Sequence, residues 1–169
     1  QRLSGILTLP QRKEIFLAML NDVINVLQAS DLIKGLAIVT ADPEVKKIVE
    51  SSINAVKPVT FILEKDSLTL NGALNYAIRE LESYNTTRVL ILHGDLPFIR
   101  LEALNKLVKL ADLYQMVIIP DRHFKGTNGL LLNPLKIIRP AFGADSFSKH
   151  LAKAKAMDLL YYIYAHPAL

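Results

Sequence analysis

The dipeptide Gly94-Asp95 places a carboxylate directly after a short run of apolar, β-prone residues, Val89–Leu92. Such a run is typical of a strand buried on both faces, and therefore of a central strand in a largely parallel sheet. Ligands of open α/β sheets bind beyond the carboxyl ends of the strands. The Asp95 carboxylate could hold Mg²⁺ there and, through it, a phosphate. Alternatively, Asp95 only closes a turn or caps the helix that begins near Arg100.

A second segment with possible chemistry is Gly126-Thr127-Asn128-Gly129, which lies between two expected strands. The two glycines would let a ligand approach the backbone closely, and Thr127 offers a hydroxyl and an amide to an anion. The alternative is a loop made of ordinary turn residues.

The third segment, Phe142–Phe147, leads into an expected helix. The amides of a helix N-terminus attract anions, so Gly143 and Ser146 would suit a phosphate or a carboxylate. Alternatively, Asp145 or Ser146 only caps the helix. His150 follows Ser146 by four residues and therefore shares a helix face with it.

Basic residues gather near the start of the sequence at Arg2, Arg12 and Lys13. These side chains could bind a triphosphate, although basic residues gathered in this way more often form a solvent-exposed face. No histidine is spaced for zinc. The sequence has no phosphate-binding loop of the G-x-x-x-x-G-K-[ST] type and no G-x-S-x-G elbow, which argues against those ATPases and serine hydrolases.

The composition limits the classes of function. With 169 residues, 51% of them hydrophobic, the chain fits one domain with a sizeable core. The net charge of +4 is mild and no Lys/Arg-rich tract occurs, so we expect a phosphorylated small molecule as partner and no nucleic acid. No cysteine is present, which fits a cytoplasmic protein. No apolar run approaches the length of a membrane span, and no membrane partner is expected.

Hydrophobic periodicity predicts alternating helices and strands from residue 36 to residue 119. This alternation indicates an α/β fold, a three-layer α/β/α sandwich with a mostly parallel mixed sheet, as one domain over residues 1–169. The predicted helices cover residues 10–29, 70–82, 101–110 and 145–156. A further helix is predicted to begin at Pro43, with Asp42 as its N-cap and Val45, Ile48 and Val49 on its inner face. The predicted strands cover residues 36–39, 59–63, 89–92, 116–119, 129–132 and 159–164, and residues 64–69 are expected to be a polar connector.

In this order the segments resemble the 2-phospho-L-lactate guanylyltransferase (CofC-like) family, a branch of the GT-A-like nucleotidyltransferases with the nucleotide-diphospho-sugar transferase fold. The likeness spans almost the entire chain. The matching motifs are Arg2-Leu3-Ser4, Leu9-x-Gln11-Arg12, Thr40–Val45, Leu70-Asn71-x-Ala73-Leu74, Gly94–Pro97, Gly126–Asn128 with Leu130-Leu131, Phe142-Gly143-x-x-Ser146-Phe147-x-x-His150, and His166–Leu169.

The resemblance implies an enzyme that joins GTP to 2-phospho-L-lactate or phosphoenolpyruvate and releases diphosphate, in coenzyme F-420 biosynthesis. It implies Asp95 as catalytic, Mg²⁺-binding residue and Thr127, Gly143 and Ser146 as the phospho-acid site. Asn71 would meet the guanine, and Arg2 would also bind the nucleotide. A homodimer is left open, and the rival hypothesis is a non-catalytic nucleotide-binding or regulatory domain of the same fold.

Two family features are not found in the sequence. The opening strand with its Lys-containing phosphate loop is expected before Arg2, and a D-I-D-T-P-E-D-L-like segment with a second metal-binding Asp is expected after Leu169.

Overall fold

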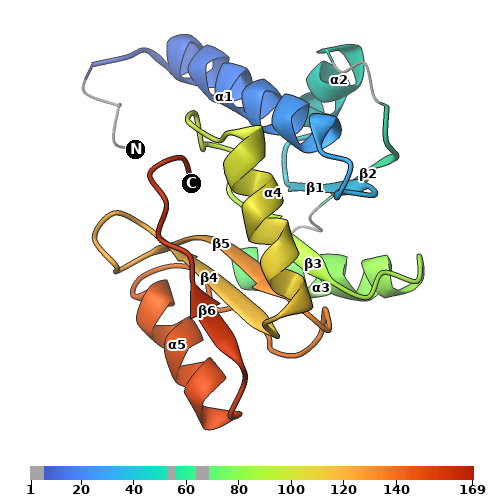
Figure 1. Cartoon of the computed structure of the whole chain (residues 1–169). Helices are drawn as coiled ribbons and strands as arrows, with labels where there is room; N and C mark the ends of the chain where they lie inside the picture. Colours follow the sequence, from blue (N-terminus) through green and yellow to red (C-terminus); the bar gives the residue numbers. More distant parts are fainter. Residues whose placement is uncertain (1–5, 53–55, 64–68) are drawn as a thin grey trace.

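The computed structural model describes residues 6–52, 56–63 and 69–169 (Figure 1). In chain order the elements are α1 (Leu9–Ala29), β1 (Leu36–Thr40), α2 (Pro43–Ser52), β2 (Val59–Leu63), α3 (Leu70–Glu82), β3 (Val89–Leu92), α4 (Leu101–Lys109) with the short 3₁₀ helix η1 (Leu110–Asp112), β4 (Met116–Pro120), β5 (Thr127–Leu132), α5 (Ser146–Ala156) and β6 (Tyr161–Ile163). The predicted helices and strands are therefore confirmed, with shifts of at most two residues at their ends. The predicted connector 64–69 lies outside the described residues, except for Thr69.

The helix starts follow from local side-chain chemistry. The Gln11 side chain accepts a hydrogen bond from the Thr8 amide at 2.9 Å, and Pro10 lies in the first turn of α1. The Asp42 carboxylate accepts from the Glu44 amide at 2.8 Å and begins α2, as predicted. The Thr69 hydroxyl accepts from the Gly72 amide at 3.2 Å and begins α3.

The strands form two sheets in the described part of the chain. β1 pairs with β2 in parallel, and the other four strands follow the order β3-β5-β4-β6. β5 runs antiparallel to both β3 and β4, whereas β4 and β6 are parallel. The predicted α/β class with a mixed sheet is confirmed, and the pairings divide equally between parallel and antiparallel because β5 is inserted between two strands of the opposite direction.

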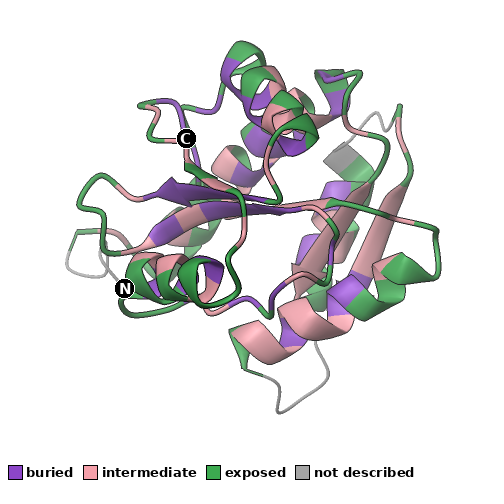
Figure 2. Cartoon of the chain, turned by 60° about the horizontal axis from the view of Figure 1, so that its bottom comes forward, coloured by how far each residue is buried: buried purple, intermediate pink, exposed green. Residues whose placement is uncertain are grey.

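Helices cover both faces of the four-stranded sheet (Figure 1). On one face, Val117, Ile119 and Leu131 pack with residues of α1 and α4. On the other face, Met116, Ile118, Leu130 and Leu132 pack with residues of α3 and α5. Figure 2 shows the buried positions concentrated along β4 and β5. The three-layer arrangement therefore follows from the alternation of side chains along these two strands.

β3 differs from the prediction that it is a central strand buried on both faces. It is an edge strand of its sheet, and all four of its residues are only partly buried. The strand buried on both faces is β4, in which every residue is buried. The run of apolar residues in β3 arises because helices cover both of its faces, while its second edge borders a cavity.

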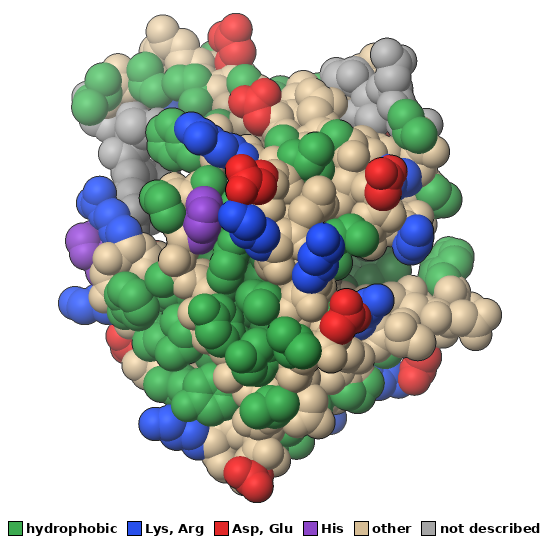
Figure 3. Space-filling view, in the orientation of Figure 1, with side chains coloured by type: hydrophobic (Ala, Val, Ile, Leu, Met, Phe, Trp, Pro, Cys, Tyr) green, Lys and Arg blue, Asp and Glu red, His purple; other side chains and the backbone are tan. Residues whose placement is uncertain are grey.

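This cavity separates β1 from β3 and has a volume of about 860 Å³. Its walls are the edges of both strands, together with apolar side chains of α1 and α3 that include Leu20, Ile24, Leu74 and Ile78. Figure 3 shows a recess at the right of the view, between the positions of β2 and α3 in Figure 1. The two sheets thus face each other through strand edges that have no partner strand among the described residues.

Within the described residues, no helix is long and apolar enough to cross a membrane. On the face shown in Figure 3, basic and acidic side chains are interspersed, and no continuous basic stripe is visible.

Candidate functional site

The candidate site lies where the end of β3 meets the start of β5. Leu92 pairs with Gly129, and the His93 amide continues the ladder by donating to the Asn128 carbonyl at 3.2 Å. Thr127, expected in a loop, is in fact the first residue of β5. Because β5 is antiparallel to β3, its amino end adjoins the carboxyl end of β3, where Gly94 and Asp95 follow.

Close contact between these strands depends on Gly129. A Cβ atom there would lie 2.6 Å from Leu92 Cδ2 and 3.1 Å from the Ile91 carbonyl oxygen. Gly129, which was expected to let a ligand approach the backbone, therefore allows β3 and β5 to pack closely. Only a residue without a side chain lets β3 and β5 meet at this position.

The loop before Thr127 is closed by Asp121. One oxygen of its carboxylate accepts from the amides of His123 and Lys125, each at 3.0 Å. Burial raises the pKa of Asp121, but the hydrogen bonds from the Lys125, Gly126 and His123 amides outweigh this effect and hold the pKa below its ordinary value. The ionised carboxylate thus fixes the loop that leads into β5.

The two segments predicted to form the phospho-acid site are neighbours. The Phe147 amide, in the first turn of α5, donates to the Lys125 carbonyl at 3.1 Å. The Thr127 hydroxyl lies 3.0 Å from His150 Nδ1, one turn further along the same helix. Thr127 and Ser146 are both buried. They therefore lie on the same side of the sheet, as expected.

The turn before α5 is built without a side-chain cap. Asp145 occupies the N-cap position in a left-handed conformation (φ 53°), and its carboxylate makes no hydrogen bond to the helix, so a capping role for Asp145 is wrong. Gly143 has φ +113°, and a Cβ added there would meet no atom within 4 Å. Ser146 is 2% exposed, and its hydroxyl makes no hydrogen bond to another described residue. Unpaired donors and open space therefore meet at this turn.

Two histidines hold Thr127 from different sides. His93 Nε2 donates to the Thr127 carbonyl at 3.0 Å, and His150 contacts its hydroxyl. The Phe142 ring lies between the two imidazoles, edge-to-face with each, at 5.4 Å from His93 and 5.1 Å from His150. Burial, with a smaller contribution from the nearby Lys153, lowers the pKa of His150 to about 4, so this imidazole is neutral near pH 7.

Asn71, predicted to meet guanine, connects α3 to the same turn. Its Nδ2 donates to the Phe142 carbonyl at 2.9 Å, and its Oδ1 accepts from the Phe142 amide at 2.8 Å. One Nδ2 hydrogen remains for a further partner. Asn71 thus fixes the backbone just before Gly143.

Asp95 is exposed and forms no hydrogen bond or ion pair with another described residue. Its carboxylate therefore remains available to a ligand, and a turn-closing or capping role for Asp95 is wrong. The described residues contain no group of three His, Cys, Asp or Glu side chains placed to hold a metal ion. A cation at Asp95 would therefore need further ligands, and a bound phosphate can supply them.

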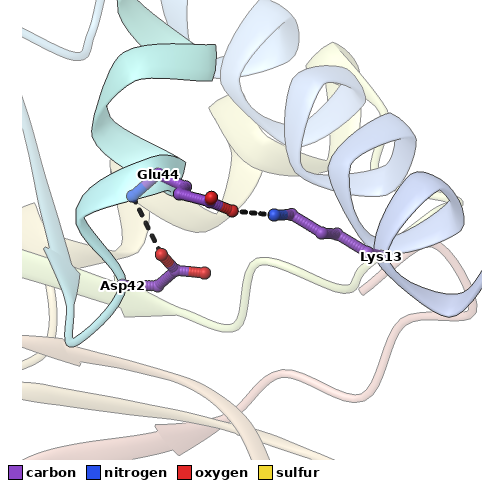
Figure 4. Close-up of polar contacts among 3 residues, drawn as sticks. All are labelled: Lys13, Asp42 and Glu44. Carbon is purple, nitrogen blue, oxygen red and sulfur yellow. Dashed lines mark hydrogen bonds and ion pairs between the residues drawn. The ribbon is translucent and has the colours of Figure 1, made fainter. Parts of the chain in front are cut away.

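Of the basic residues near the start, Arg2 lies outside the described residues. Lys13 forms an ion pair with Glu44, shown in Figure 4 beside the Asp42 cap of α2. The hydrogen bond that Lys13 donates to the Glu44 carboxylate raises the pKa of Lys13. Arg12 Nε is buried and has no hydrogen-bond partner among the described residues. Arg12 is therefore the better placed of the two to accept an anion.

Sequence reasoning gave no role to His93 or Phe142. His150 was indicated by its four-residue spacing from Ser146 and by its place in the motif that begins at Phe142. Nothing in the sequence indicated that His93 would contact Thr127, which lies more than thirty residues later.

Comparisons with known proteins agree with this geometry. The family model described as "Guanylyl transferase CofC like" matches residues 1–166. A phosphoenolpyruvate guanylyltransferase from Conexibacter woesei is 35% identical over 161 residues, covering 94% of this chain and 70% of the relative. A 2-phospho-L-lactate guanylyltransferase from Methanocaldococcus jannaschii is 34% identical over 163 residues, covering 96% of this chain and 67% of the relative.

Among solved structures, a protein from Desulfovibrio desulfuricans G20 described as a nucleotide-diphospho-sugar transferase superimposes with a TM-score of 0.77 at 16% identity. The match covers 97% of this chain and 72% of that one. At this identity the likeness concerns the fold alone, and it agrees with the expected GT-A-like architecture. The family match over nearly the whole sequence shows that this chain belongs to the CofC-like guanylyl transferase family.

Proposed function

We propose that the protein transfers a guanylyl group from GTP to the phosphate of a three-carbon phospho-acid, either 2-phospho-L-lactate or phosphoenolpyruvate. An oxygen of the acceptor phosphate attacks the α-phosphorus of GTP, a new P–O–P linkage forms and diphosphate leaves. The product would enter coenzyme F-420 biosynthesis. The attacking phosphate is already an anion, so the reaction needs no general base and depends on in-line positioning and charge neutralisation.

The observation that carries this proposal is the pairing of Thr127 with the α5 turn, next to the end of β3. In the proposal the phospho-acid lies against the Thr127 hydroxyl, the unobstructed backbone at Gly143 and the Ser146 hydroxyl. The amides of Ser146 and Phe147 are already bonded to the Gly143 and Lys125 carbonyls, so the first turn of α5 would favour an anion through the helix dipole. Because none of these three groups is charged, none competes for a cation at Asp95.

Asp95 is proposed as the residue that holds Mg²⁺. An exposed carboxylate without another partner suits this ion, which commonly takes one or two carboxylates together with substrate phosphates. When bound, the ion would supply charge neutralisation on the phosphates. Asn71, through its remaining amide hydrogen, and Arg2 are proposed to contact the nucleotide.

The experiment that tests this function measures diphosphate release. The protein is mixed with GTP and Mg²⁺, and then with 2-phospho-L-lactate or phosphoenolpyruvate in separate reactions. We expect release that requires both substrates and stops when Mg²⁺ is chelated. Replacing GTP with ATP, CTP or UTP tests the choice of base.

The rival hypothesis, a nucleotide-binding domain without turnover, predicts a different pattern. A thermal-shift series would then show stabilisation by GTP while no diphosphate appeared with either phospho-acid. That result would contradict the enzymatic proposal.

A further inference from the structure

His150 is fully buried, and both of its ring nitrogens are engaged. The Ala141 amide donates to Nε2 at 2.9 Å, and the Thr127 hydroxyl lies 3.0 Å from Nδ1. A backbone amide can only donate, so Nε2 must be the unprotonated nitrogen of the ring. A neutral imidazole carries one hydrogen, which is therefore on Nδ1.

This tautomer determines the direction of the hydrogen bond to Thr127. Nδ1–H donates, and the Thr127 oxygen accepts. A hydroxyl that accepts in this way still has its own hydrogen to donate. Thr127 is 3% exposed, and its hydroxyl has no other hydrogen-bond partner among the described residues. A buried hydroxyl hydrogen is thus left without an acceptor among the described residues.

We propose that His150 is a positioning residue that, through Nδ1–H, makes the Thr127 hydroxyl a hydrogen-bond donor toward an anionic oxygen of the phospho-acid. This inference rests on the proposed function, because it takes the phospho-acid as the acceptor. His93 completes the arrangement by fixing the carbonyl of the same residue. His150 itself does not need to touch the substrate.

Two substitutions at His150 separate its two hydrogen bonds. In His150→Asn, the side-chain amide nitrogen can take the place of Nδ1 and donate to Thr127, while the acceptor for Ala141 is lost. In His150→Gln, the side-chain oxygen can reach the Nε2 position and accept from Ala141, while the donor to Thr127 is lost. The exposed His123 provides the matched control, His123→Gln.

The test measures KM and kcat for each substrate in the wild type and these variants. His150→Gln should raise the KM for the phospho-acid on the order of tenfold, the cost of one misplaced hydrogen bond to a charged group. The KM for GTP should change much less. His150→Asn should remain closer to the wild type, and His123→Gln should not differ from it. Equal phospho-acid KM values for His150→Gln and the wild type would overturn the inference, even if the enzyme were active.

A spectroscopic measurement tests the tautomer without turnover. In a long-range ¹H–¹⁵N correlation spectrum near pH 7, the histidine signals lost in His150→Gln should belong to a neutral ring protonated at Nδ1. A ring protonated at Nε2 would overturn the inference whatever the activity. The Nδ1 tautomer could be present in a wild type that releases no diphosphate and binds neither phospho-acid by calorimetry. In that case the proposed function has failed, and the role of His150 toward that substrate fails with it. If the wild type is active, the phospho-acid KM values of the His150 variants decide whether His150 positions the Thr127 hydroxyl.

Discussion

The two halves of the candidate site are built in different ways. Around Thr127, hydrogen bonds with His93, His150 and Asn71 hold the Thr127 carbonyl, the Thr127 hydroxyl and the backbone of Phe142. Around Asp95, the carboxylate is exposed, and the described residues contain no group of three His, Cys, Asp or Glu side chains placed to hold a metal ion. The phospho-acid half is therefore organised before a ligand arrives, whereas the nucleotide and metal half depends on what binds there. Substitutions should accordingly act on catalysis at Asp95 and on binding and stability around Thr127.

The largest effect is expected for Asp95→Asn. It should lower kcat on the order of 10²–10³-fold, because it removes the charge that would hold the cation against the phosphates. The thermal midpoint should not change, since Asp95 is exposed. Asp112→Asn, at another exposed carboxylate paired with Arg88, is the matched control and should retain full turnover. Near-normal diphosphate release from Asp95→Asn would show that the two halves do not differ as described.

Thr127→Val should act on substrate binding. It removes a hydrogen bond to a charged group, worth about 1.5–3 kcal/mol, so the phospho-acid KM should rise about ten- to a hundredfold while the GTP KM changes little. Thr127→Ser keeps the hydroxyl and should restore most of the affinity. A larger change in the KM for GTP would place the phospho-acid elsewhere.

The stability of the protein should depend on pH through His150. Its pKa is about 4 in the folded protein and near 6.5 in the unfolded chain, so between these values only the unfolded chain binds the proton. Stability from this residue is complete above about pH 6.5, falls as the pH decreases toward 4 and changes no further below that. Between pH 7 and pH 4.5 this loss should be about 2 kcal/mol. Urea unfolding at pH 7 and pH 4.5 gives the change in the free energy of unfolding for the wild type and for His150→Gln. The variant should lack the part of this change that comes from His150.

The smallest effect is expected for Gly143→Ala. The added Cβ meets open space, so only the backbone conformation at φ +113° is strained, at a cost of about 1–2 kcal/mol. The phospho-acid KM should rise severalfold. Gly35→Ala is the control, because its Cβ would make only an ordinary contact with the Pro58 carbonyl. If both variants behaved alike, the turn before α5 would be less rigid than the hydrogen bonds of Asn71 indicate.

Local patterns were sufficient to predict the elements and some of the site. Proline and capping residues marked the starts of α1 and α2, helical periodicity marked α3, and apolar runs marked the strands. The proximity of Thr127 and Ser146 was also foreseen. The roles of Asn71 and His93 were not, because each depends on a backbone group that is distant in sequence, Phe142 in one case and Thr127 in the other. The edge position of β3 was missed for a related reason. The apolar side chains of β3 indicate that helices cover both of its faces. They do not indicate whether a partner strand is hydrogen-bonded to each edge of its backbone.

The cavity between β1 and β3 also affects how the protein behaves in concentrated solution. Each of its two strand edges presents backbone N–H and C=O groups in the pattern that templates the addition of another strand. Lysine and arginine side chains are the usual means of discouraging such addition, and Lys34 and Arg88 stand among the residues that border the opening. Since the rest of the lining is largely apolar, solubility depends on these two cations, and high salt, which screens their charge, should promote turbidity.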